Sequence, residues 1–253
     1  MAKYIDADNL INELSAACMP IYEKGITGIL GDNSSIMLTK KKKNKKNYKG
    51  GNAMSETVSG EELEKINDYV REPLTEDKVF VFRVALCDND IDRDGEKFSS
   101  GALRKLAELF KGRTGIFDHD PKSSKQTARI FDTWVETLPE KTTTDGEVYR
   151  KLMAKAYMVR TASNGDLISE IQGGIKKEVS ITCTMGEKLC SVCGEDMHKG
   201  SCGHEKGGEY GGMLCYHILD EPLEAYKWSF VAVPAQVQKN GTESLATRRD
   251  SNA

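Results

Sequence analysis

The sequence predicts a mixed α+β domain that spans about residues 78–236. At least six runs have the two-residue alternation or the β-branched and aromatic content of strands, whereas only two stretches have a clear helical period. With 253 residues, of which 38% are hydrophobic, the chain is long enough for one large domain with appendages.

Composition narrows the classes of function. A formal net charge of −3 gives the whole chain no attraction for a polyanion such as nucleic acid. No apolar run approaches the length needed to span a membrane, and the first residues lack the apolar segment of a secretion signal. The chain has seven cysteines, and in a cytosolic protein such an odd set favours a metal site over disulfides.

Residues 1–53 differ from the rest of the chain and are interpreted as an N-terminal extension. A short amphipathic helix is predicted near residues 10–17, and residues 40–46 contain six lysines. Such a run repels itself and predicts a disordered linker, with a basic arm that meets DNA or an acidic scaffold as the alternative. A third explanation is that translation starts at Met54, since Lys49-Gly50-Gly51 could be encoded by a ribosome-binding site.

Residues 54–77 are predicted to form a short helical lead-in to the domain. Ser59 precedes two glutamates, which is the pattern of a capped helix, and Pro73 marks its end. Residues 79–86 are then almost continuously apolar, which predicts a strand buried on both faces.

An acidic turn follows this strand. Asp90, Asp92, Asp94 and Gly95 match the first half of a calcium-binding EF-hand loop. The twelfth position is Gly101 instead of the required glutamate, and the preceding element is a strand. We therefore expect a polar turn without calcium.

The middle of the chain contains two further helices and a hairpin. Ser99 or Ser100 is predicted to cap a helix over residues 101–111, which Gly112 ends. Strands are predicted at residues 127–138 and 147–159, joined by a turn at 141–146. A helix over residues 164–171, capped by Ser163, then delivers the chain to a glycine pair.

The stretch after this glycine pair organises the candidate site. Its side chains alternate, with Val179, Ile181 and Cys183 on an apolar face and Ser180, Thr182 and Thr184 on a face of hydroxyls. Upstream, a short apolar run ends at His119 in a turn. If the two strand ends meet, His119 could be the base that activates Ser180. Cys183 is a rival nucleophile, but the alternation places it on the buried face.

Three segments together resemble a known family. The segments FDHD around His119, GGIKKEVSIT around Ser180 and YKWSFVAVPAQ before residue 236 resemble the prohead (capsid maturation) serine proteases of tailed phages, which are related in fold to herpesvirus assemblin. The resemblance covers residues 78–236 and implies a closed or nearly closed β-barrel with flanking helices. It also implies that Ser180 is the nucleophile and that His119 is the general base.

The resemblance further implies a biological setting. Such a serine endopeptidase cleaves scaffold protein, major capsid protein and itself inside the immature phage head, in the host cytoplasm. Self-association in the prohead is expected, and neither a membrane nor a nucleic acid is an expected partner.

Three residues are candidates for the third catalytic position. The family often has an acid just before the closing strand, which favours Glu224 here, with Asp220 and His217 as rivals. Where relatives often carry an acid two residues before the closing serine, this chain has Lys227.

A cysteine cluster predicts a zinc site. Cys190 and Cys193 form a C-x2-C pair, and Cys202 and His204 follow as C-x-H in a glycine-rich insertion, residues 188–212. Four such ligands close a tetrahedral Zn²⁺ site and leave no position for water, so its role is structural. Cys215 and His217 are reserve ligands, and His198 is a weaker one.

The C-terminal part of the chain is predicted to contain two more strands. They are expected at residues 213–219 and 225–233, followed by a loose tail, residues 237–253.

Two other functions compete with the protease. One alternative is a non-catalytic head-morphogenesis or scaffold-associated protein on the same fold. A zinc-containing nucleic-acid-binding module is a weaker alternative, because the cysteine cluster has few basic or aromatic neighbours.

Overall fold

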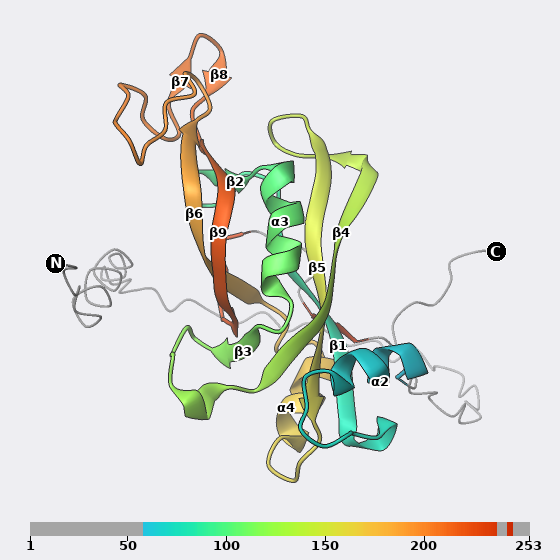
Figure 1. Ribbon diagram of the computed structural model, residues 1–253. Coiled ribbons are helices and arrows are strands. Elements are labelled where there is room, and N and C mark those ends of the chain that lie inside the picture. Colours follow the sequence, from blue (N-terminus) through green and yellow to red (C-terminus); the bar gives the residue numbers. More distant parts are fainter. Residues whose placement is uncertain (1–57, 237–241, 245–253) are drawn as a thin grey trace, which may run out of the picture. The chain divides into compact units, whose positions relative to one another are not determined.

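An eight-stranded sheet and three α-helices form the part of the chain that this computed structural model describes, residues 58–236 and 242–244 (Figure 1). The helices are α2 (Gly60–Asn67), α3 (Ser100–Phe110) and α4 (Gly165–Gln172), with short 3₁₀ turns at Glu76–Lys78 and Ser123–Lys125. The mixed α/β class is therefore confirmed.

The strands pair in a defined order. They are β1 (Val79–Asp88), β2 (Glu96–Phe98), β3 (Thr114–Phe117), β4 (Ala128–Thr142), β5 (Val148–Val159), β6 (Val179–Cys190), β9 (His217–Phe230) and β10 (Thr242–Ser244). The sheet runs β10-β1-β5-β4-β3-β9-β2, and β6 pairs with β9. A separate small hairpin joins β7 (Glu209–Tyr210) to β8 (Met213–Leu214).

The antiparallel strands β1, β5 and β4 match the predicted runs. All residues of β1 except Arg83 are buried, as expected for an apolar strand covered on both faces. The turn between β4 and β5 uses Gly146 at φ 86°, a left-handed conformation that favours glycine, and the Gly146 amide donates to the Thr143 carbonyl.

Strand β9 corrects the prediction of two separate strands at residues 213–219 and 225–233. It runs without interruption from His217 to Phe230 and includes Pro222. Pro222 pairs with Met185 of β6, where the register shifts between Thr184 and Met185, and Glu221 adopts φ 49°. These local irregularities let one strand continue through a proline that would otherwise end it.

Helix capping follows the sequence, with one correction. Ser59 and Glu62 form a reciprocal capping box on α2, and the Ser99 side chain accepts from the Ala102 amide at the start of α3. For α4 the N-cap is Asn164 and not Ser163. The Asn164 side chain is bonded to the preceding turn, where it accepts from the Thr161 amide and donates to the Val159 carbonyl.

The main core lies between α3 and the sheet. Trp228 of β9 is fully buried and contacts Phe82 and Phe230 edge to face. Helix α3 packs against β9, β4 and β5, next to which it lies in Figure 1. The side chains that it buries there are apolar. Truncating a buried tryptophan of this kind to alanine costs about 3–5 kcal/mol.

The ladders of the described residues do not close into a ring. Strands β1 and β6 pack against each other without pairing, so no closed barrel is found in this part of the chain, where a closed or nearly closed barrel was expected. In the tail that was expected to be loose, Thr242–Ser244 adds β10 to the edge of β1. The predicted extension, residues 1–53, and the lysine run lie outside the described residues.

None of the helices in the described ranges has the length and apolar character needed to cross a membrane.

Gly115 provides a test of the packing between β3 and β9. A Cβ atom at Gly115 would lie 2.3 Å from Cζ2 of Trp228. We expect Gly115→Ala to lower the free energy of unfolding by about 1–3 kcal/mol, because the buried indole cannot yield without disturbing its neighbours. Gly165→Ala is the matched control, since no atom lies within 4 Å of its added methyl group. Urea unfolding measures the stability of both variants. A Gly115→Ala protein as stable as the native one would contradict the close packing of Gly115 against Trp228.

Candidate functional site

Strand β6 presents its hydroxyls on one face, as the alternation predicted. Val179 is buried, and Ile181 and Cys183 pack against the core from the same side. Burial raises the pKa of Cys183 to about 11, so its thiol stays protonated and a poor nucleophile at neutral pH. Ser180 and Thr182 therefore lie on the opposite face of the strand.

The partner strand adds two side chains to this face. In the antiparallel ladder Ser180 lies opposite Ser229, and Thr182 lies opposite Lys227. Directly opposed residues project to the same side of a sheet, with Cβ atoms about 4.5–5.5 Å apart. We call the surface formed by Ser180, Thr182, Lys227 and Ser229 the hydroxyl face.

His119 is brought to this face by β3. That strand runs parallel to β9 and ends at Phe117, opposite Phe230. Asp118 and His119 then take left-handed conformations, with φ of 50° and 56°, and the Asp118 amide donates to the Phe230 carbonyl. The Lys227 ammonium donates to the His119 carbonyl at 2.5 Å and fixes the turn from the other side.

The imidazole of His119 contacts two hydroxyls across the face. Its Nδ1 lies 3.2 Å from Ser229 Oγ and 3.3 Å from Thr182 Oγ1. Ser229 is fully buried, while Thr182 is half-buried. Among the described residues, neither His119 Nε2 nor Ser180 Oγ makes a hydrogen bond. The structure thus places Ser180 and His119 on one face without joining them directly.

The surroundings of His119 favour the neutral ring. Partial burial against the two strands, together with the nearby Lys227 ammonium, lowers its pKa, and Asp118 opposes this effect only in part. Burial also lowers the pKa of Lys227. A neutral imidazole is the form that can accept a proton from a hydroxyl.

None of the three residues considered for the third catalytic position bonds to His119 among the described residues. Glu224 lies opposite Thr184 and is exposed. Asp220 accepts a hydrogen bond from Ser99 Oγ, and His217 lies opposite Cys190 at the far end of β6. Lys227 contacts the backbone of His119 and not its ring.

The sequence prediction missed Ser229 as a neighbour of His119. The only available signal was its position in the closing segment, between Trp228 and Phe230, where alternation turns a serine away from two core aromatics. Which histidine nitrogen it would meet depends on the parallel pairing of β3 with β9, and no sequence pattern indicates that pairing.

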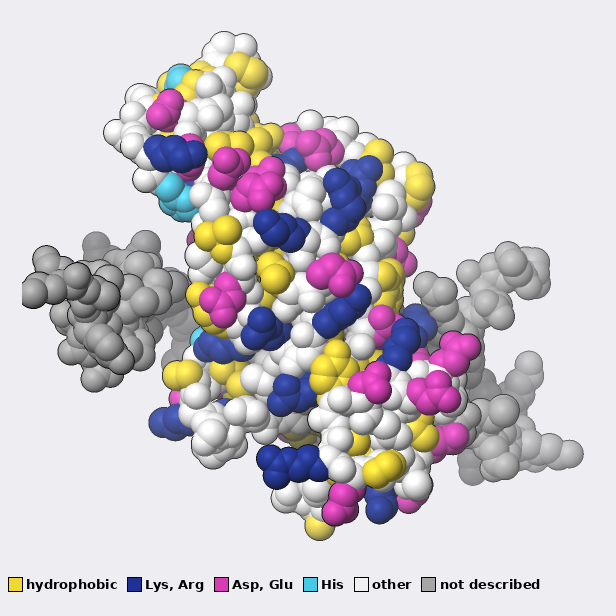
Figure 2. Space-filling view, in the orientation of Figure 1, with side chains coloured by type: hydrophobic (Ala, Val, Ile, Leu, Met, Phe, Trp, Pro, Cys, Tyr) yellow, Lys and Arg dark blue, Asp and Glu magenta, His cyan; other side chains and the backbone are white. Residues whose placement is uncertain are grey.

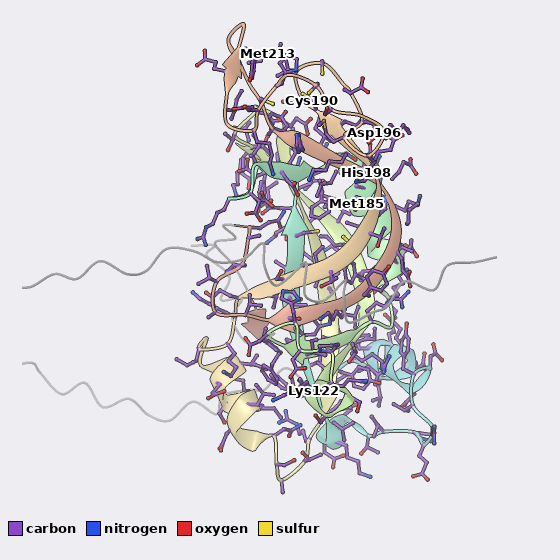
Figure 3. The ribbon with its side chains drawn as sticks, turned by 90° about the vertical axis from the view of Figure 1, so that its left-hand side faces the viewer. Lys122, Met185, Cys190, Asp196, His198 and Met213 are labelled. Atoms are coloured by element: carbon purple, nitrogen blue, oxygen red, sulfur yellow. The ribbon has the colours of Figure 1, made fainter. Side chains whose placement is uncertain are left out.

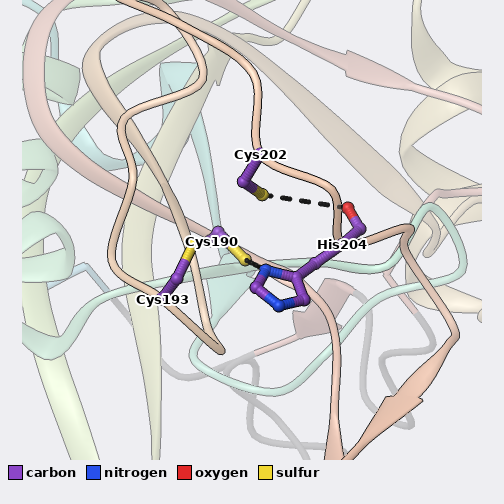
Figure 4. Close-up of side chains that lie close together, drawn as sticks. All are labelled: Cys190, Cys193, Cys202 and His204. Atoms are coloured by element: carbon purple, nitrogen blue, oxygen red, sulfur yellow. Dashed lines mark hydrogen bonds between the residues drawn. The ribbon is translucent and has the colours of Figure 1, made fainter.

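The predicted zinc ligands converge at the opposite end of β6. Ligand atoms of Cys190, Cys193, Cys202 and His204 all lie within 4.8 Å of one another, and Cys190 Sγ is 3.8 Å from His204 Nδ1 (Figure 4). Burial raises the pKa of Cys190, but hydrogen bonds from the amides of Cys193 and Val192 and from the thiols of Cys202 and Cys193 together lower that pKa to about 6. Three thiols and an imidazole suit the soft-ligand preference of zinc, so the cluster could hold a metal ion.

Two of the three reserve ligands, Cys215 and His198, differ in their position relative to the cluster. Cys215 is buried, with its Sγ 4.0 Å from Cys190 Sγ, and it lies beside the cluster. His198 lies outside it, where its ring contacts the Gly186 carbonyl. Figure 3 shows Cys190 and His198 towards one end of the β6–β9 pair, with Met185 further along β6 and Lys122 near the opposite end of the molecule.

The acidic turn after β1 uses its carboxylates internally. Asp92 Oδ1 accepts from the amides of Asp94 and Glu96, and Asp90 Oδ1 accepts from Thr144. These bonds are those of a polar turn, as expected.

Comparisons with known proteins find no match. No model of a protein family, no curated protein and no solved structure is significantly similar to this chain.

The cysteine cluster makes a prediction about metal content. We expect one zinc ion per chain in native mass spectrometry and its loss in Cys193→Ser, because that substitution removes one of four ligands. Cys183→Ser should keep the ion, since this thiol lies on β6 outside the cluster. Chelation should lower the melting temperature. A zinc-free protein with unchanged thermal stability would show that the cluster does not bind a structural metal.

Lys227 makes a prediction about protonation. Lys227→Met should raise the pKa of His119, because it removes the ammonium that disfavours the imidazolium. NMR titration of the ring measures this shift directly. Lys177→Met is the control, since Lys177 pairs with Glu178 and not with His119. An unchanged or lowered pKa in Lys227→Met would contradict the electrostatic description.

Proposed function

We propose that this chain is a serine endopeptidase of the prohead-maturation type, with Ser180 as nucleophile and His119 as general base. The observation that carries the proposal is the position of His119. A histidine from a separate element lies against a strand face that presents a row of hydroxyls, and the pKa of this histidine is lowered. The family resemblance of the three segments adds to this geometry.

The proposed chemistry follows the serine–histidine scheme. The Ser180 oxygen bonds to the scissile carbonyl carbon while its proton passes to His119 Nε2, and that proton then goes to the leaving amine. Water hydrolyses the acyl-enzyme by the same proton relay. The Ser180–His119 distance must shorten when substrate binds, as is common for catalytic hydrogen bonds.

The surroundings of Ser180 leave room for a peptide. In the described part of the chain β9 is the only strand that pairs with β6. A bridge between Leu189 and Asp196 covers the far end of the other edge, which leaves the stretch near Ser180 for an added strand. A hollow of about 190 Å³ lies beside Ser180, and its lining includes Leu86, Phe98 and Gln236. An extended segment of a capsid or scaffold protein is a substrate of suitable shape.

Closure of the barrel, the partners and the cellular location belong to the same proposal. The open sheet, in which β1 packs against β6, is interpreted as a nearly closed barrel. The substrates are scaffold protein, major capsid protein and the chain itself, in the immature head within the host cytoplasm, and Zn²⁺ has a structural role. Basic and acidic side chains are interspersed on the face in Figure 2, which gives no support there to a nucleic-acid partner.

A second candidate is a non-catalytic head-morphogenesis protein on the same fold. The absence of a Ser180–His119 hydrogen bond among the described residues favours it, as does the lysine at position 227. In that case Ser180 is an ordinary strand serine.

Self-processing distinguishes the two candidates. We expect the full chain to cleave itself or a capsid substrate, and Ser180→Ala or His119→Gln to lower the rate by several orders of magnitude. The double variant should be little worse than either single one, because the two groups act as a unit. Cys183→Ser should stay active, since this thiol faces the core. Intact-mass measurements identify the cleavage products.

Two outcomes contradict the assignment. If Ser180→Ala still processes its substrate, Ser180 is not the nucleophile. If Thr182→Val is inactive while Ser180→Ala is active, Thr182 is the nucleophile, since its hydroxyl is the accessible one in contact with His119.

A further inference from the structure

The two ring nitrogens of His119 have different surroundings. Nδ1 faces the sheet, where it meets Ser229 and Thr182. Nε2 has no hydrogen-bond partner among the described residues, and the same holds for Ser180 Oγ. A histidine base in a serine hydrolase needs one nitrogen held and the other left for the nucleophile.

Ser229 has the properties of the group that holds the ring. It is fully buried, so water does not compete for its hydroxyl. Its backbone is fixed on both sides, since Ser229 lies opposite Ser180 in one ladder and opposite Ile116 in the other. Thr182, by contrast, is half-buried and can exchange its contact for one with water.

We propose that Ser229 is the positioning residue of His119 and takes the place that a carboxylate occupies in a serine–histidine–acid triad. Its Oγ accepts a hydrogen bond from Nδ1–H and so selects the tautomer in which Nε2 carries the lone pair. Nε2 is then the nitrogen that takes the Ser180 proton. The catalytic role of Ser229 rests on the proposed function. Its effect on the tautomer of the His119 ring does not depend on that function.

A neutral hydroxyl differs from a carboxylate in one respect. It orients the ring and selects a tautomer, yet it offers no negative charge to the imidazolium that forms in the reaction. The second fixed point is Lys227, which holds the His119 carbonyl and not the ring. Among the described residues the His119 ring contacts two hydroxyls, of which only that of Ser229 is fully buried, and its carbonyl accepts from one ammonium, while no carboxylate hydrogen-bonds to the ring.

The direct test is the tautomer of His119, read from the ¹⁵N shifts of its two ring nitrogens by NMR. The native protein above the His119 pKa should carry its proton on Nδ1. Ser229→Ala should shift the population towards the Nε2–H form. Ser229→Cys is the second variant if alanine impairs folding, because a thiol of similar shape is a weak acceptor and should act in the same direction.

Two control variants separate positioning from general damage. Thr184→Val removes a hydroxyl from the same face of β6 that bonds to Tyr226 and not to His119, and it should leave the tautomer unchanged. Glu224→Gln tests the residue favoured from the sequence and should also leave it unchanged. A native Nε2–H tautomer would overturn the proposal. So would a tautomer that responds to Glu224→Gln but not to the Ser229 variants.

Kinetics give the catalytic half of the test. Ser229→Ala should lower kcat by about 10- to 100-fold with little change in KM, because it misdirects a base without touching the substrate. An unchanged kcat would overturn the catalytic role even if the tautomer shifts. If the native protein has no peptidase activity, the proposed function fails, while the tautomer measurement still decides whether Ser229 orients His119.

Discussion

The antiparallel ladder between β6 and β9 is the interaction on which the rest of the structure depends. It runs from Val179 opposite Phe230 to Cys190 opposite His217. One end forms the hydroxyl face, and the other carries the first ligand of the cysteine cluster. On its other edge β9 pairs with β3, so the turn that holds His119 is also placed by this strand. A slip of one residue in the ladder would turn Ser180 towards the core.

Apolar packing, more than hydrogen bonding, sets that register. Trp228 is fully buried against Phe82 and Phe230, and such a side chain contributes about 3–5 kcal/mol. A typical hydrogen bond contributes about 1 kcal/mol, and a ladder that slips by one residue can remake most of its hydrogen bonds but not this burial. The core therefore decides which β9 side chains face inward, and Ser229, as the neighbour of Trp228, must face His119. The polar arrangement follows from the packing on the reverse side of the same strand.

The same distinction explains how much the sequence could predict. Alternation around Ser180, the continuously apolar β1 and the cysteine spacing are local patterns, and each was predictable before the structure was known. The continuity of β9 through Pro222 depends on a register shift in its partner, which no local pattern contains. Contacts of His119 likewise require the order of β3, β9 and β6, so Ser180 and His119 were predictable as candidates and Ser229 was not.

The length of β6 separates the two candidate centres. Ser180 and Cys190 are ten positions apart in one strand, which corresponds to roughly 30 Å at about 3.3 Å per residue. A metal ion at the cysteine cluster is therefore too distant to polarise a bond at Ser180. A metal ion at this cluster can act only by restraining the chain around it. Cys190 at the end of β6 and three ligands from the loop that leads to β9 would together fix this loop where a free pair of strands would fray, and the ladder transmits that restraint to the hydroxyl face.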